Sequence, residues 1–295
     1  MTYQTKLAIV LVIFLWASAF VGIRAGLQAY SPEGLALLRY LIASFCIGVV
    51  YFQKTQKKPM RIRDICGLLS IGMIGIGLYN IALNYGELSV SSGIASFITN
   101  QSPLVTTIFA ILFLGESLSF LGVIGFVISI FGIALITLTE SPGFNWNIGI
   151  LYILLATFVA GCYSVLQKPF LKRYHPIQTT TYIIWGGTLF LLFYFSHLHH
   201  DLLVAPFRST LIVIYLGIFP AAMGYVAWSY VLMNVSVSRA VSFIYFIPVV
   251  TVLLGWFFLK EIPMGITFCG GLLAMFGVWL VNQSYSKSNK FKNHK

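Results

Sequence analysis

The sequence predicts an all-α, polytopic membrane protein with ten transmembrane helices. Of its 295 residues, 59% are hydrophobic and only 8% are charged, whereas a soluble domain carries about a quarter charged residues. So few charges cannot cover a water-facing surface, which places most of the chain in lipid. Ten apolar runs are each long enough, at roughly 20 residues, to cross the hydrocarbon core as a helix. The last five runs repeat the first five, which predicts two five-helix units.

The ten runs follow one another with short connections that leave no room for a soluble domain. They cover residues 7–29, 34–52, 65–86, 89–114, 118–139, 148–167, 177–196, 210–232, 238–259 and 263–282. Lipid-facing backbone must satisfy its own hydrogen bonds, which restricts spanning segments to helices or closed barrels. The runs do not alternate as barrel strands do, so we interpret all ten as helices.

The first run needs a separate argument, because Lys6 followed by an apolar stretch and Ala17-Ser18-Ala19 resembles a cleavable signal peptide. Cleavage would leave the first unit one helix short of the second. We therefore expect the first run to remain as a permanent helix.

An internal repeat relates residues 85–132 to residues 230–277 at a fixed offset of 145 positions. Such repeats are typical of secondary transporters. Because each unit holds an odd number of helices, homologous units must enter the membrane from opposite sides. We therefore predict two inverted units, at residues 1–139 and 148–282, followed by a basic tail at residues 283–295.

The distribution of basic residues gives an independent prediction of orientation. With the N-terminus inside, the cytoplasmic loops and the tail hold most of the lysines and arginines, and the remaining four are Arg24, Arg39, Arg208 and Lys260. This bias predicts that both termini lie in the cytoplasm. We expect the membrane to be a bacterial inner (plasma) membrane. Topology also explains the net charge of +11, so we expect no nucleic acid as a partner. The partners that we expect are membrane lipid and a small-molecule substrate. The sequence leaves the oligomeric state open, with a monomer as one possibility.

Each half resembles an EamA domain of the drug/metabolite transporter superfamily. The pattern is a helix of small residues with an internal proline, a Leu-x-Glu close and a helix that carries glycines. The first copy reads Ser91-Ser92-Gly93, Pro103 and Leu114-Gly115-Glu116, and the second reads Ser236, Pro248 and Leu259-Lys260-Glu261. The resemblance implies a bundle with a central cavity lined by the fourth and ninth helices together with the first, third, sixth and eighth. The fifth and tenth helices would pack at the periphery.

Candidate substrate-binding residues are neutral polar and aromatic side chains within the runs. We find no charged side chain at the centre of a run and expect no carboxylate relay. The candidates are Trp16, Tyr79, Asn80, Asn84, Asn100, Gln101, Tyr163, Trp228 and Tyr245. A buried amide needs a partner, so each amide either faces the cavity or bonds to another helix. Each aromatic ring either lines the cavity or packs in the core.

Two further groups of residues are candidates for supporting roles. Pro103 and Pro248 recur in both units and interrupt helices, so they predict hinges, with static kinks as the alternative. Arg24 and Arg39 lie in the outer parts of their runs. Either they line an outer vestibule that attracts an anionic group, or they extend to the membrane interface.

No metal or cofactor site is predicted. His197, His199 and His200 with Asp201 fall in a short loop that we interpret as an exposed polar segment. The predicted function is a secondary transporter of small organic solutes, with amino acids as the leading class, that works by export or facilitated exchange. Drug-like or nucleotide-type metabolites are the alternative cargo. A membrane enzyme or a scaffold without transport is the alternative of a different class, and no catalytic constellation supports an enzyme.

Overall fold

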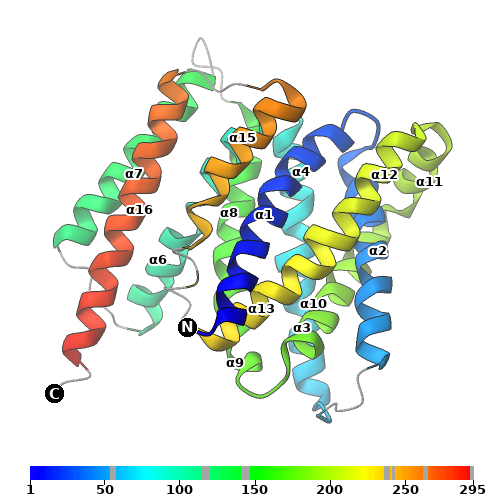
Figure 1. The fold of residues 1–295 in the computed structure, drawn as a ribbon, viewed down its shortest axis with the longest axis horizontal. Helices are drawn as coiled ribbons and strands as arrows, with labels where there is room; N and C mark the ends of the chain where they lie inside the picture. The colour runs from blue at the N-terminus through cyan, green and yellow to red at the C-terminus, as the bar shows by residue number, and fades with distance from the viewer. Residues whose placement is uncertain are drawn as a thin grey trace.

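The computed structural model describes residues 1–53, 58–114, 120–140, 147–235, 240, 243–261 and 265–292. These residues form a bundle of helices in which α16 ends at the same end of the bundle at which α1 begins (Figure 1). Among the described residues, six helical spans are long and apolar enough to cross a membrane: Tyr3–Gly26, Pro32–Gln53, Ile62–Glu87, Ile148–Leu171, Pro176–Val204 and Phe207–Asn234.

The described part of the first half contains seven α-helices and one π-helical segment. They are α1 (Tyr3–Gly26), α2 (Pro32–Gln53), α3 (Ile62–Gly72), the π-helix η1 (Met73–Leu78), α4 (Tyr79–Glu87), α5 (Ser92–Thr99), α6 (Ser102–Leu114) and α7 (Phe120–Glu140). Because α3, η1 and α4 follow without interruption, they form one span.

The described part of the second half follows the same order. It contains α8 (Ile148–Leu166), α9 (Lys168–Leu171), α10 (Pro176–Leu191), the 3₁₀ turn η2 (Leu192–Tyr194), α11 (Phe195–Val204), α12 (Phe207–Leu216), the π-helix η3 (Gly217–Met223), α13 (Gly224–Asn234), α15 (Ile247–Leu259) and α16 (Gly265–Lys292).

Helix boundaries in the two halves recur at the offset of the sequence repeat. Helices α6 and α15 are both 13 residues long and begin at Ser102 and Ile247. The π-helices η1 and η3 also occupy matching positions. A π-helix is rare and is found mostly as a single turn inside an α-helix. Its recurrence at the same offset therefore marks the two halves as copies of one helical plan.

The fourth predicted run, residues 89–114, is not one helix. Helix α5 ends at Thr99 and α6 begins at Ser102, with Pro103 in its first turn. Pro248 likewise lies in the first turn of α15. A proline in the first turn removes an N–H group that has no partner within the helix. Both prolines thus follow a break, and the interior of each helix stays regular.

The prediction of an exposed loop after residue 196 is wrong, because the chain remains helical through Val204. Asp201 is buried, and one of its carboxylate oxygens accepts hydrogen bonds from the Ser31 backbone N–H at 2.9 Å and the Ser31 hydroxyl at 2.6 Å. This carboxylate anchors the start of α2. Within the described ranges, no group of three metal-ligating side chains comes together.

Helices α7 and α16 pack against each other at one side of the bundle (Figure 1). Glycines of both helices make this approach possible. A methyl group at Gly132 would lie 2.5 Å from the backbone nitrogen of Ala274, and one at Gly277 would lie 2.5 Å from the carbonyl oxygen of Gly125. The peripheral pairing of the fifth and tenth spans therefore depends on residues without side chains.

Candidate functional site

A cavity of about 80 Å³ lies between the two halves of the chain. Its volume is several times the roughly 10–15 Å³ that one buried water occupies. Its walls come from α1, α2, η1, α4, α8 and α13, from the break between α5 and α6, and from the residues around the start of α15. The cavity can therefore hold a small solute in contact with both halves.

Aromatic rings cover much of the cavity wall. The ring centroid of Trp16 lies 5.3 Å from that of Trp228 and 5.6 Å from that of Tyr225, and Tyr225 lies 5.8 Å from Tyr163. Tyr79 completes this wall from α4. Such rings offer flat apolar contact to a ligand and also polar edges.

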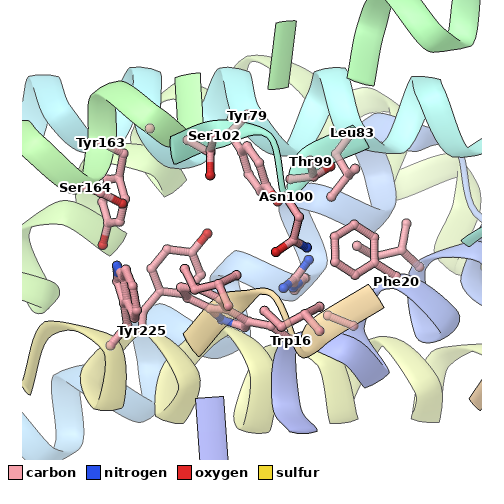
Figure 2. A pocket seen from close by; sticks show the side chains of 18 residues that line it. Trp16, Phe20, Tyr79, Leu83, Thr99, Asn100, Ser102, Tyr163, Ser164 and Tyr225 are labelled. Atoms are coloured by element: carbon pink, nitrogen blue, oxygen red, sulfur yellow. The ribbon is translucent and has the colours of Figure 1, made fainter. Parts of the chain in front are cut away.

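Asn100 projects into the cavity from the break between α5 and α6 (Figure 2). Its side-chain nitrogen donates to the carbonyl oxygen of Ser96 at 2.9 Å, one turn earlier in α5. Its side-chain oxygen is buried and has no hydrogen-bond partner among the described residues. The break thus presents a free acceptor to the cavity.

Arg39 supplies positive charge to the same cavity. The residue is only 3% exposed, and its Nη1 donates to the side-chain oxygen of Asn80 at 3.0 Å. Its Nε has no hydrogen-bond partner, and none of the ion pairs formed by the described residues includes it. A buried charge without an ion-pair partner is costly, so this guanidinium is suited to an anionic ligand group.

The vestibule prediction for Arg39 is therefore corrected, because the side chain lies in the cavity wall. The internal repeat already indicated that Arg39 faces the interior of the bundle. The matching residue in the second half is Ile184, which is fully buried. A position that buries an isoleucine in one copy faces the interior in the other.

Asn80 and Asn84 share one helix face, as predicted, but neither lines the cavity. Asn80 donates to the hydroxyl of Tyr40 at 2.9 Å and accepts from Arg39, while Asn84 donates to the carbonyl oxygen of Pro32 at 2.8 Å. Both amides therefore hold α4 against α2. Asn80 also orients the guanidinium that does face the cavity.

Gln101 and Tyr245 also point away from the cavity. The Gln101 oxygen accepts from the hydroxyl of Ser129 on α7 at 2.5 Å. The Tyr245 hydroxyl donates to the carbonyl oxygen of Val278 on α16 at 3.4 Å, and its ring packs there. Both residues fix the inner helices to the peripheral pair, so their placement near helix breaks was a poor guide to their direction.

Arg24 lies outside the central cavity, in a surface hollow of about 250 Å³ beside Glu261. The two side chains form an ion pair at 3.0 Å. Glu261 thus bonds to a basic side chain of the first half, whereas its counterpart Glu116 falls outside the described residues.

Glu87 is a functional candidate that sequence reasoning missed. The residue is fully buried, and neither carboxylate oxygen has a hydrogen-bond partner within the described structure. From the sequence we expected no carboxylate relay, and this buried acid was not singled out. Glu87 directly follows the predicted run 65–86, which made it resemble a loop residue, whereas the structure places it as the last residue of α4. Its counterpart in the repeat, Leu232, is an apolar residue that is buried. This match was the sign in the sequence that position 87 faces the interior.

A second and larger hollow, of about 510 Å³, lies between α1, α2, α10 and the η3–α13 span. Its lining is almost entirely apolar, and His175 and Tyr230 are the exceptions. It brings together none of the unpartnered polar atoms found in the central cavity. The central cavity is therefore the stronger candidate for binding a polar solute.

The model of the EamA-like transporter family matches this chain twice, at residues 5–138 and 147–283. The chain belongs to the EamA-like transporter family. It is a multi-pass membrane protein and a transmembrane transporter of the drug/metabolite type, which points away from an enzyme.

Relatives and a solved structure match this EamA-like transporter along nearly its whole length. It is 36% identical to the uncharacterized transporter YdfC of Bacillus subtilis, covering 98% of this chain and 94% of the relative. It is 33% identical to a probable terminal-alkyne amino-acid exporter of Streptantibioticus cattleyicolor, over 94% and 92%. A probable amino-acid metabolite efflux pump of Escherichia coli is 23% identical, over 92% of each. A crystal structure at 17% identity covers 99% of both chains with a TM-score of 0.66, which shows the same fold.

Proposed function

We propose that this EamA-like transporter moves amino acids with apolar side chains, or closely related metabolites, out of the cell by alternating access. The observation that carries the proposal is the buried guanidinium of Arg39, which faces the cavity without a carboxylate partner. A substrate carboxylate would supply the missing negative charge. The free oxygen of Asn100 would accept from the substrate ammonium group.

The aromatic wall supports the second part of this proposal. Trp16 and Trp228 contact each other and enclose the apolar side of the cavity. A flat, apolar surface suits a branched or aromatic side chain better than a charged one. Two relatives bear names of amino-acid or amino-acid metabolite exporters, which favours the same substrate class over drug-like or nucleotide-type cargo.

The orientation and mechanism are part of the same proposal. We infer that the two halves are inverted copies in the bacterial inner membrane, with both termini in the cytoplasm. The position of α16 relative to α1 supports an even number of crossings, and the distribution of basic residues supports the direction. The cavity would open to each side in turn as the halves rock about it.

Counterflow in proteoliposomes tests the substrate assignment. Vesicles loaded with unlabelled L-leucine should accumulate radiolabelled L-leucine saturably. L-Phenylalanine should compete, whereas L-leucinamide and N-acetyl-L-leucine should compete weakly because each lacks one of the two charged groups. Equal competition by all three competitors would contradict the assigned roles of Arg39 and Asn100. An unsaturable leak would contradict a carrier mechanism.

A further inference from the structure

A compact cluster joins four parts of the chain at the end of the bundle where α1 finishes. Arg24 donates from Nε to Glu261 Oε1 at 3.0 Å, and from Nη1 to the carbonyl oxygens of Glu87 and of Leu88, the latter at 3.0 Å. The other oxygen of Glu261 accepts from the backbone N–H of Ser92 at 3.1 Å and from its hydroxyl at 2.9 Å. We call the Arg24–Glu261 pair the end clamp.

The end clamp connects the two halves. Arg24 and Ser92 belong to α1 and α5 of the first half, whereas Glu261 follows α15 of the second half. The pair also satisfies backbone groups at the end of α4 and at the start of α5, which would otherwise lack partners. Movement of one half against the other at this end would require the clamp to break.

The carboxyl group of Glu87 lies beside this clamp but takes no part in it. Arg24 binds the backbone carbonyl of Glu87, while both side-chain oxygens remain without a partner and the residue has no exposed surface. An ionised carboxylate in such a place would lack both water and hydrogen bonds, whereas a protonated one costs much less to bury. The closed clamp therefore fits a Glu87 that holds a proton.

Charged and titratable neighbours face Glu87 from several elements. They are Arg24 from α1, Arg39 from α2, Glu261 after α15, and Tyr79 from α4 itself. Helix α5 has no titratable side chain.

On α8, Tyr152 stacks on Tyr85 of α4 at 5.4 Å between ring centroids. Leu83, one turn before Glu87, lines the central cavity. The carboxyl thus lies between the cavity and the end clamp.

We propose that Glu87 is a proton-binding site that controls the end clamp. With the proton bound, Glu87 is neutral, Arg24 stays with Glu261, and this end of the cavity is closed. When the proton passes to water, the new carboxylate requires either hydration or Arg24, and both compete with the Arg24–Glu261 contact. The closed state is then favoured at low pH and the open state as pH rises. The proposal rests on alternating access and adds solvent protons as the coupling ion.

Distance measurements between spin labels test the switch without any substrate. Cysteines introduced at Leu88 and Leu259, which line the hollow beside the clamp, would carry the labels after replacement of the four native cysteines. In the wild-type background, the distance between labels should increase as pH rises from about 5 to about 9, a range above the ordinary titration of an exposed glutamate. Glu87→Gln, a neutral mimic of the protonated acid, should keep the short distance throughout.

Three further variants separate a switch from a structural effect. Glu87→Asp should restore the pH response with a shifted midpoint, and Glu261→Gln should give the long distance at every pH. Glu33→Gln removes another buried carboxyl, one that is already bonded to Tyr85, and should leave the response unchanged. A wild-type distance that is independent of pH, or a full response in Glu87→Gln, would overturn the proposal.

Vesicle measurements connect the switch to transport. With a pH-sensitive dye inside, L-leucine efflux should be accompanied by proton uptake in wild type and not in Glu87→Gln, while leucine–leucine exchange continues in both. If wild-type vesicles exchange no leucine, the substrate assignment fails, and the label distances still decide the role of Glu87.

Discussion

At the scale of single residues, the cavity combines one buried cation, one free amide oxygen and several aromatic rings. Arg39 is held by Asn80, so its charge is fixed in place before any ligand arrives. A prearranged group of this kind loses little freedom on binding, which increases the affinity it contributes.

We expect Arg39→Gln to weaken the apparent affinity for L-leucine by roughly 10- to 100-fold, because hydrogen bonds to charged groups each contribute about 1.5–3 kcal/mol. Competition by L-leucinamide should change much less, since this compound has no carboxylate. Arg173→Gln is the matched control, because Arg173 is half-exposed and pairs with Asp64 away from the cavity. An equal loss for leucine and leucinamide would argue against a carboxylate contact.

The neighbours Asn100 and Gln101 offer a second matched pair. Asn100→Ala should lower leucine transport several-fold with normal expression, because a ligand acceptor is lost. Gln101→Ala should leave affinity unchanged and reduce stability by about 1 kcal/mol, since it removes the bond to Ser129 on α7. Transport in detergent-purified, reconstituted protein and thermal unfolding measure the two effects. If Gln101→Ala lowered transport and Asn100→Ala only reduced stability, the binding site would have to lie on the side of the helix break that Gln101 faces.

At the scale of helices, the breaks before α6 and α15 are the main irregular features near the cavity. The prolines were predictable as interruptions, but their position in a first turn was not. A sequence window sees only a proline inside a long apolar run. It does not show that the α-helical hydrogen bonding of α5 ends at Asn100 and gives way to a tighter turn at Gln101 before α6 begins.

Replacing Pro103 or Pro248 with alanine should slow turnover more than it weakens binding. Alanine restores an N–H donor and allows α5 to continue into α6, which would stiffen a joint that we propose as a hinge. Pro176→Ala is a suitable control, because Pro176 also begins a helix but lies away from the central cavity. A variant that loses affinity at an unchanged maximal rate would contradict the hinge.

The contact between α7 and α16 gives a prediction about stability. Gly132→Ala should destabilise the protein by about 1–3 kcal/mol, because its methyl group would meet backbone atoms that cannot move aside independently. Gly265→Ala, at the start of α16, has no atom within 4 Å of the new methyl and should be neutral. Thermal unfolding in detergent compares the two. Similar melting temperatures would show that the helices separate easily.

At the scale of the whole molecule, composition was sufficient to predict ten apolar runs, and the family resemblance implied the peripheral place of the fifth and tenth. They were less informative about the direction in which each side chain points from its helix. Asn80, Gln101 and Tyr245 all lie near the cavity in sequence, yet each bonds to a neighbouring helix. Which face of an apolar helix meets the cavity depends on packing of distant segments, and a run that is apolar on every side carries little periodicity to reveal it.

Two basic side chains occupy comparable places in the two halves. Arg24, near the end of α1, binds carbonyl oxygens at the end of α4. Lys168, just after α8, binds the carbonyl oxygens of Leu232 and Val235 at the end of α13, the latter at 2.7 Å. Helices α1 and α8 finish at opposite ends of the bundle (Figure 1). Cations therefore neutralise the helix C-termini at both ends, which is the arrangement expected if inverted copies close the cavity from either side.

This arrangement predicts the sidedness of two exposed residues. Gln28, after α1, should face the outside, and Lys172, after α9, should face the cytoplasm. In intact cells, a membrane-impermeant maleimide should label a cysteine at Gln28, whereas a cysteine at Lys172 should react only after the membrane is opened. The four native cysteines must first be replaced. Labelling of both positions from the same side would rule out inverted units, because equivalent helix ends would then lie on one face of the membrane.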